Sequence, residues 1–136
     1  MPAAVTSGED VLEAFVAGPD QANRLFTVTG TALVDIRASG EQKTETFTFQ
    51  VGPTLMRGQF HRAIAVASVS SQTVGTATGR QPAPPTFIVR INSVQAGWDP
   101  ESERVVVRVQ VLLSVSASGM VHIEGLHYWV TILAQI

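Results

Sequence analysis

Cysteine is absent from the 136 residues of this chain. The absence excludes disulfide bonds, thiolate metal sites and thiol nucleophiles, and it leaves the redox compartment open. A chain of this length can bury roughly two-thirds of the surface that its unfolded state exposes. We therefore expect its stability to come from a hydrophobic core.

Charge is also scarce. Asp, Glu, Lys and Arg make up 15% of the sequence, against about 25% in ordinary soluble domains. The formal net charge is −2, and the nine cations are all arginine except Lys43 and form no basic run. A nucleic-acid-binding or anionic-membrane surface needs clustered positive charge, so both are excluded as partners. The low charge, together with 45% hydrophobic residues, indicates that something other than water covers part of the surface.

Long hydrophobic runs and targeting signals are missing as well. No apolar stretch approaches the roughly 18 residues of a transmembrane helix. The first six residues, Met-Pro-Ala-Ala-Val-Thr, contain neither a basic region nor an apolar one, so no signal peptide is evident. We expect a soluble protein that is cytoplasmic or associated with a particle.

The N-terminal segment, residues 1–20, has the pattern of a short helix. Ser7 can act as an N-cap, Glu9 and Asp10 place acids in the first turn, and Gly18-Pro19 provides a stop. These are the usual start and stop signals of a helix. The sequence therefore predicts one short helix before the first strand.

Alternating apolar and polar residues then predict β-strands over residues 24–37 and 44–51. We expect these two to form a hairpin, with Gly30 and Ala32 opposite Phe49 and Val51. Residues 60–70 alternate poorly, which fits a buried strand or a helical turn, and we favour a central strand. Residues 72–85 are rich in Thr, Gly and Pro and predict a long loop. A further strand is expected over residues 86–96.

The strongest pattern lies in the C-terminal third of the chain. From residue 105 to 115 every odd position is Val or Leu. After a turn at 117–119, the apolar positions are odd up to Ile123 and even from Leu126 onward. This slip at Glu124-Gly125 would turn later side chains to the wrong face unless a β-bulge corrects it. We therefore predict a long, bulged C-terminal hairpin in which Val109 faces Tyr128.

These elements predict an all-β fold. We expect an antiparallel β-sandwich or barrel of six to seven strands, with the short N-terminal helix and the bulged hairpin, in a single domain over residues 1–136.

Three residues on the outward face of the last strand have the chemistry of metal ligands. They are His122, Glu124 and His127. Two imidazoles and a carboxylate could bind zinc or iron. The alternative is that they are ordinary polar residues on a solvated sheet face. No fourth ligand is evident, and on this alternative the protein has no cofactor.

The same outward face of the predicted hairpin carries large apolar residues. We expect Arg108 to lie opposite Trp129 in a cation–π contact, beside Val106, Leu112 and Leu133. An apolar surface of this kind usually marks an interface with another protein. These five residues are our candidate interface.

The sequence thus favours a non-catalytic binding or structural domain that assembles as a homo-oligomer or as a building block of a larger particle. Its partner would be a copy of itself or another protein. Two alternatives stay open. One is a metal-dependent barrel enzyme that uses the histidines, and the other is a ligand-binding or carbohydrate-binding module with Trp98, Tyr128 or Trp129 as a stacking platform.

Overall fold

A computed structural model describes residues 3–17, 22–76 and 86–135, and every regular element in these ranges is a β-strand. The strands are β1 (Val5–Ala17), β2 (Ala22–Ser39), β3 (Gln42–Val51), β4 (Phe60–Thr76), β5 (Phe87–Asp99), β6 (Arg104–Val115) and β7 (Gly119–Gln135). The expected all-β class is confirmed. These ranges contain no helix with the length and hydrophobicity needed to span a bilayer.

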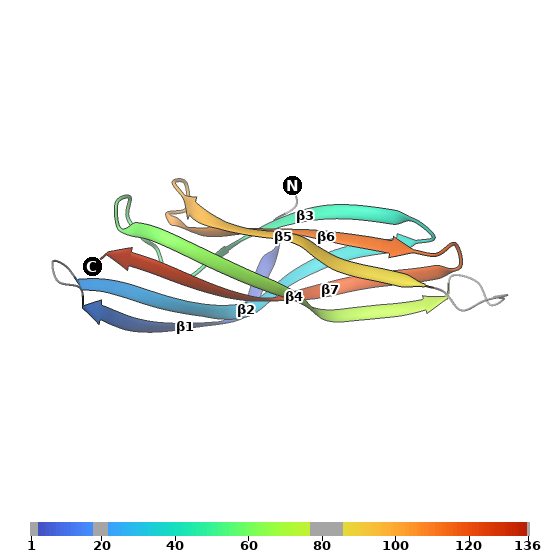
Figure 1. Cartoon of the computed structure of the whole chain (residues 1–136), viewed down its shortest axis with the longest axis horizontal. Helices are drawn as coiled ribbons and strands as arrows, with labels where there is room; N and C mark the ends of the chain where they lie inside the picture. Colours follow the sequence, from blue (N-terminus) through green and yellow to red (C-terminus); the bar gives the residue numbers. More distant parts are fainter. Residues whose placement is uncertain (1–2, 18–21, 77–85, 136) are drawn as a thin grey trace.

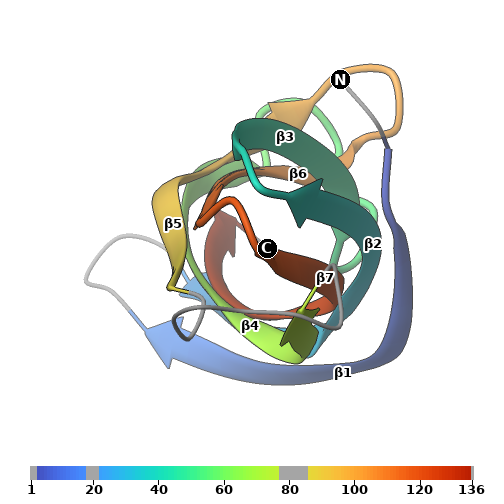
Figure 2. The same ribbon diagram turned by 90° about the vertical axis from the view of Figure 1, so that its right-hand side faces the viewer.

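The strands form two antiparallel sheets that pack face to face as a sandwich. One sheet has the order β1-β2-β7-β4 and the other the order β3-β6-β5. Several strands are unusually long, and they make the molecule elongated along the strand direction (Figure 1). Viewed from one end, the two sheets curve around a common core, and β1 lies on the outside (Figure 2).

The core lies between the sheets and is built from the alternating residues of the strands. β6 contributes Val105, Val107, Val109, Val111, Leu113 and Val115, and β7 contributes Val121, Ile123, Leu126, Tyr128, Val130, Ile132 and Ala134. Successive side chains of a strand point to opposite faces, so one apolar set per strand is enough to fill the interior. Among the described residues, no charged or polar side chain other than the Tyr128 phenol is buried.

The predicted C-terminal hairpin is wrong. β6 pairs with β3 and β5, whereas β7 pairs with β2 and β4, so the two strands belong to different sheets. The turn between them crosses from one sheet to the other, and it includes a hydrogen bond from Gly119 N to Ser116 O (2.9 Å). The inward faces of β6 and β7 were predicted correctly, but they meet across the core and are not paired side by side.

The predicted hairpin over residues 24–51 is wrong for the same reason. β2 pairs with β7 and β3 pairs with β6. Gly30 and Ala32 therefore lie opposite Tyr128 and Leu126 of the same sheet. Phe49 approaches Tyr128 from the other sheet, with a distance of 5.0 Å between ring centroids.

The predicted change of phase in the last strand is confirmed. Ile123 and Leu126 are both fully buried, while Glu124 between them is exposed. The ladder with β2 shifts at this level, where Val34 and Asp35 together oppose Glu124. The ladder with β4 shifts there as well. These irregularities keep both halves of β7 facing the core.

The predicted N-terminal helix is wrong, because Val5–Ala17 is strand β1 and pairs along its length with β2. The segment is too short to be stable as an isolated helix, and pairing with β2 satisfies its backbone instead. The ladder is interrupted between Ser7 and Asp10, which is where the helix start was expected.

Residues 60–70 form a strand, as favoured, but not a central one. β4 lies at the edge of its sheet and continues to Thr76. The first part of the predicted 72–85 loop is therefore strand, and residues 77–85 lie outside the described residues. The strand expected over residues 86–96 is β5.

Candidate functional site

The outer face of the four-stranded sheet carries a group of large apolar side chains. Strand register places Trp129 beside Val66 of β4 and Thr29 of β2. Two residues further along the strands, a second row runs across the sheet. It consists of Ile64 of β4, Thr131 of β7, Thr27 of β2 and Leu12 of β1. Directly paired residues point to the same side of a sheet, so these side chains share one face.

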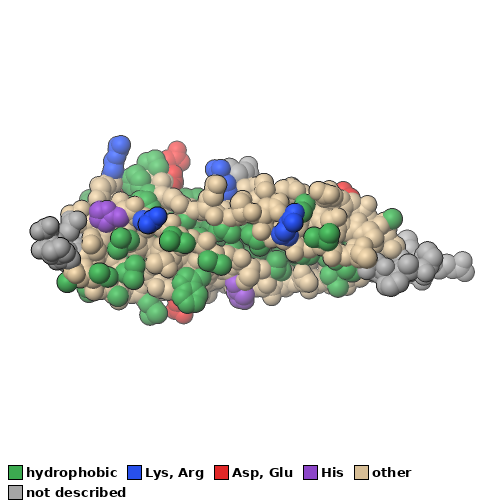
Figure 3. All heavy atoms as spheres, viewed as in Figure 1, with side chains coloured by type: hydrophobic (Ala, Val, Ile, Leu, Met, Phe, Trp, Pro, Cys, Tyr) green, Lys and Arg blue, Asp and Glu red, His purple; other side chains and the backbone are tan. Residues whose placement is uncertain are grey.

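We call this surface the Trp129 face. It consists of Leu12, Leu25, Ile64, Val66, Trp129 and Leu133. Leu12 is 71% exposed, Val66 63%, Ile64 60% and Trp129 57%, while Leu25 and Leu133 are half-buried. Figure 3 shows apolar side chains scattered over the visible side of the molecule, with a few Lys, Arg and His side chains among them.

Charged residues stand at two corners of the Trp129 face. Asp10 of β1 pairs with Thr29 in the row of Trp129, and Arg62 of β4 pairs with Leu133 in the row of Leu25. Both side chains are exposed. The face therefore carries apolar side chains around Thr27 and Thr131, with one acidic and one basic corner.

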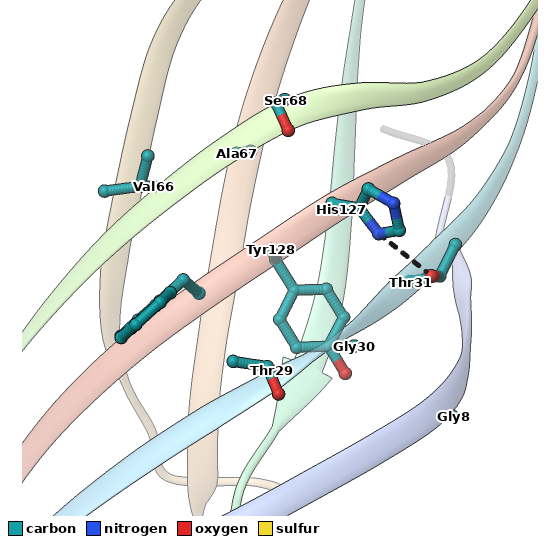
Figure 4. Close-up of a pocket in the computed structure, with 10 residues that line it drawn as sticks. Gly8, Thr29, Gly30, Thr31, Val66, Ala67, Ser68, His127 and Tyr128 are labelled. Atoms are coloured by element: carbon teal, nitrogen blue, oxygen red, sulfur yellow. Dashed lines mark hydrogen bonds between the residues drawn. The ribbon is translucent and has the colours of Figure 1, made fainter.

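A shallow hollow of about 480 Å³ adjoins Trp129. Its walls include Thr29, Thr31, Ser68 and His127, and its floor includes Gly30 (Figure 4). The hydroxyl of Thr31 and Nδ1 of His127 lie 3.3 Å apart, within hydrogen-bonding distance. The hollow is open and continuous with the apolar face, so it adds polar groups to the edge of that surface.

The predicted interface set does not lie on one surface. Arg108, Val106 and Leu112 are on the outward side of β6, in the three-stranded sheet, whereas Trp129 and Leu133 are on the four-stranded sheet. The predicted Arg108–Trp129 contact is therefore wrong, because it assumed that β6 and β7 pair. Leu112 is also buried rather than available at the surface. A cation–π contact occurs elsewhere, where Arg24 lies 4.8 Å from the ring centroid of Phe26.

Two of the three residues proposed as ligand platforms, Tyr128 and Trp98, make hydrogen bonds within the fold. Tyr128 is only 3% exposed, and its hydroxyl donates to Glu9 Oε1 at 2.9 Å. Trp98 is half-buried against the core and donates from Nε1 to the carbonyl oxygen of Leu55 at 2.9 Å. The Tyr128 ring is therefore not available for stacking, and Trp129, at 57% exposure, is the most exposed of the three aromatic residues considered.

The three candidate metal ligands separate into two sites. Nε2 of His122 lies 2.7 Å from Asp35 Oδ1, and its Nδ1 lies 3.3 Å from Glu124 Oε1. His127 lies beyond the change of phase and contacts Thr31 instead. Within the described ranges, no group of three or more His, Asp or Glu side chains is placed to hold a metal ion.

Asp35, His122 and Glu124 form a small surface network that the sequence did not reveal. The hydrogen bond with His122, followed by that from Arg37, lowers the pKa of Asp35 below its ordinary value. His122 and Glu124 also line a hollow of about 630 Å³ together with Val74 and Met120. The contact between Asp35 and His122 could not be predicted from the sequence, because it depends on the pairing of β2 with β7.

Residues of the Trp129 face were also missed. Leu12 was assigned to a helix, and Ile64 and Val66 to a buried strand. A usable signal was present in residues 63–67, where alanine alternates with Ile and Val. The alanines pack against the core, and the larger residues point outward. In this strand, alternation of side-chain size, rather than of polarity, indicates which side faces the core.

Comparison of the chain with protein-family models, with curated proteins and with solved structures found no match. The functional inference therefore rests on the side chains and surfaces described above.

Proposed function

We propose that this protein is a non-catalytic binding and assembly domain that acts as a homo-oligomer and buries its Trp129 face in the assembly. The observation that carries the proposal is the set of four large side chains, Leu12, Ile64, Val66 and Trp129, each more than half exposed on one sheet face. Monomeric proteins rarely leave a contiguous apolar patch of more than a few hundred Å² in water.

The composition of the face supports a protein partner rather than a small ligand. Tryptophan is enriched at the centres of protein–protein contacts and charged residues are depleted there. On the Trp129 face, the charged residues Asp10 and Arg62 stand at the margins and no charge lies between them in the three paired rows. These side chains stand on paired strands, so their backbone is already ordered before a partner binds.

A copy of the same chain suits this surface. Asp10 and Arg62 stand at diagonally opposite corners, in different rows and on the two edge strands. Two such faces can stack about a two-fold axis along the other diagonal, so that each acid meets a base of the partner. Isologous contacts of this kind are the commonest in soluble homo-oligomers.

The test compares two charge substitutions by native mass spectrometry over a range of protein concentrations. Trp129→Glu places a carboxylate among the apolar side chains of the face. Ile88→Glu is the matched control, because Ile88 is 54% exposed on β5 of the other sheet.

We expect the wild-type chain and Ile88→Glu to form the same oligomer, and Trp129→Glu to give species with fewer subunits. A wild-type chain that is monomeric at every concentration overturns the proposal. So does an oligomer that Trp129→Glu leaves intact.

A further inference from the structure

The free edge of β1 is the second feature of the molecule that suggests contact with another chain. β1 ends the four-stranded sheet and pairs only with β2. At its start, Ala3 bridges Thr48 of the other sheet, and Ala4 N donates to Thr48 O at 2.8 Å. From residue 11 to 17, however, no described strand pairs with its outer edge, and Figure 2 shows β1 on the outside of the molecule.

This stretch of β1 is apolar on both faces. Leu12 and Val16 point to the outer side of the sheet and are 71% and 43% exposed. Val11 and Phe15 point to the core side, yet they are 43% and 70% exposed. Their exposure means that the three-stranded sheet does not cover this end of β1.

The edge also lacks the features that normally protect an edge strand. Proteins usually place lysine, proline or a bulge on such an edge to prevent pairing with another chain. Residues 11–17 contain no proline and a single charge, Glu13. Glu13 Oε1 is already engaged by Arg24 Nε at 2.7 Å, so it does little to repel a second acidic strand. The ladder interruption in β1 lies earlier, between Ser7 and Asp10.

We propose that β1 pairs antiparallel with β1 of a second copy of this chain, which joins the two four-stranded sheets into one continuous sheet. The inference rests on the proposed function, because it specifies how the copies of the assembly meet. Edge addition of this kind supplies main-chain hydrogen bonds, while alternating side chains provide specificity.

The register of this pairing follows from symmetry. The two copies would be related by a two-fold axis perpendicular to the sheet. Directly paired residues point to the same side of a sheet, and successive residues of a strand point to opposite sides. The axis must therefore pass between two copies of the same residue, which pair with each other. A centre at Glu13 places two carboxylates directly opposite each other, which is unfavourable. A centre at Ala14 uses all of residues 11–17.

With Ala14 at the centre, apolar side chains match on the outer side, whereas on the core side Val11 lies opposite Ala17 and Phe15 lies opposite Glu13 of the partner. Leu12 lies opposite Val16 of the partner on the outer side, next to the Trp129 face of each chain. On the core side, Phe15 and its symmetry copy become diagonal neighbours, which are within reach of aromatic rings. The pairing thus covers four apolar side chains per chain and extends the two Trp129 faces into one surface.

Disulfide trapping tests this register directly, since the chain has no cysteine of its own. Directly opposite residues of an antiparallel pair have Cα atoms about 4.5–5.5 Å apart, which is within disulfide range. Ala14→Cys should therefore form a covalent dimer under mild oxidation. Ser93→Cys is the control, because Ser93 is exposed on β5, an edge strand of the other sheet.

The experiment is run in the wild-type background and in the Trp129→Glu background. We expect Ala14→Cys to crosslink in both and Ser93→Cys in neither. An Ala14→Cys chain that oligomerises but does not crosslink overturns the β1 pairing and leaves the proposed function standing. A wild-type chain that stays monomeric at every concentration overturns both.

A second variant tests the pairing without cysteine. Phe15→Lys adds a charge to the free edge, and Ile88→Lys adds the same charge on the other sheet. We expect Phe15→Lys to raise the dissociation constant of the dimer at least tenfold and Ile88→Lys to leave it unchanged. Equal effects of the two variants contradict the pairing.

Discussion

The hydroxyl of Tyr128 on β7 passes over Gly30 on β2 and donates a hydrogen bond to Glu9 on β1 at 2.9 Å. The other carboxylate oxygen of Glu9 lies 3.7 Å from Nη2 of Arg104, which begins β6 in the opposite sheet. Arg104 Nε in turn donates to the carbonyl oxygen of Gly52 at 3.0 Å. This chain of contacts ties the first strand to both sheets.

Gly30 is required by this arrangement. A Cβ atom at this position would clash with the Tyr128 hydroxyl and lie 2.7 Å from Cζ of the same ring. We predict that Gly30→Ala destabilises the fold by about 1–3 kcal/mol, the usual cost of overpacking a filled site. Urea unfolding measures the effect. Gly97→Ala is the control, since nothing lies within 4 Å of a Cβ there, and an equal loss in both variants would contradict the explanation.

Tyr128 should make stability fall at high pH. Burial, followed by the hydrogen bond to Glu9, raises the pKa of its phenol above the ordinary value. The unfolded chain ionises near pH 10, so the contribution of a raised pKa is complete below that pH and is lost as the pH rises further. We expect urea midpoints to drop as the pH rises above about 10, and Tyr128→Phe to lessen the drop.

The sequence contains one tyrosine, so phenolate absorbance reports this residue alone. A folded protein whose tyrosine titrates near pH 10 would contradict the prediction.

Asp35 should respond to the loss of His122. The hydrogen bond with His122 is the main cause of its lowered pKa, and Arg37 adds to it. A lowered carboxyl pKa contributes stability above the unfolded value and loses it as the pH falls. We predict that His122→Asn raises the pKa of Asp35 toward its ordinary value, as measured by carboxyl NMR titration.

Asp99 is the internal control for this titration. Its pKa is lowered by hydrogen bonds from Ser102, so His122→Asn should leave it unchanged. Shifts of equal size at both carboxylates would indicate a general change of structure instead.

The two tryptophans should differ in their importance for stability. Trp98 donates to the carbonyl oxygen of Leu55, a residue with no exposed surface. Trp98→Phe removes that donor, and we expect a loss of about 1–3 kcal/mol in the free energy of unfolding. Trp129→Phe changes an exposed side chain and should stay within about 0.5 kcal/mol. The reverse order in denaturant unfolding would contradict these roles.

The strands and their buried faces could be predicted from the sequence where polarity alternates. The inward set of β6 and the change of phase at Glu124-Gly125 in β7 follow from period-two alternation alone. Alternation failed in β1, where both faces are apolar from Val11 onward, and it was ambiguous in β4, where small residues face the core. Most of the candidate site could not be predicted for this reason, because Leu12, Ile64 and Val66 lie on these two strands.

Period-two alternation was enough to establish that the chain is all-β and which side of β6 and of β7 faces the core. Which strands are neighbours depends on how the two sheets pack. The inward apolar side chains of a strand are buried equally well whether the next strand pairs with it in the same sheet or lies across the core in the other sheet. Alternation therefore cannot distinguish a hairpin from a crossing between sheets. Because β6 and β7 belong to different sheets, Arg108 and Trp129 are far from pairing. The pairing of β2 with β7 brings Asp35 to His122, and the position of β1 at the end of its sheet leaves its outer edge free.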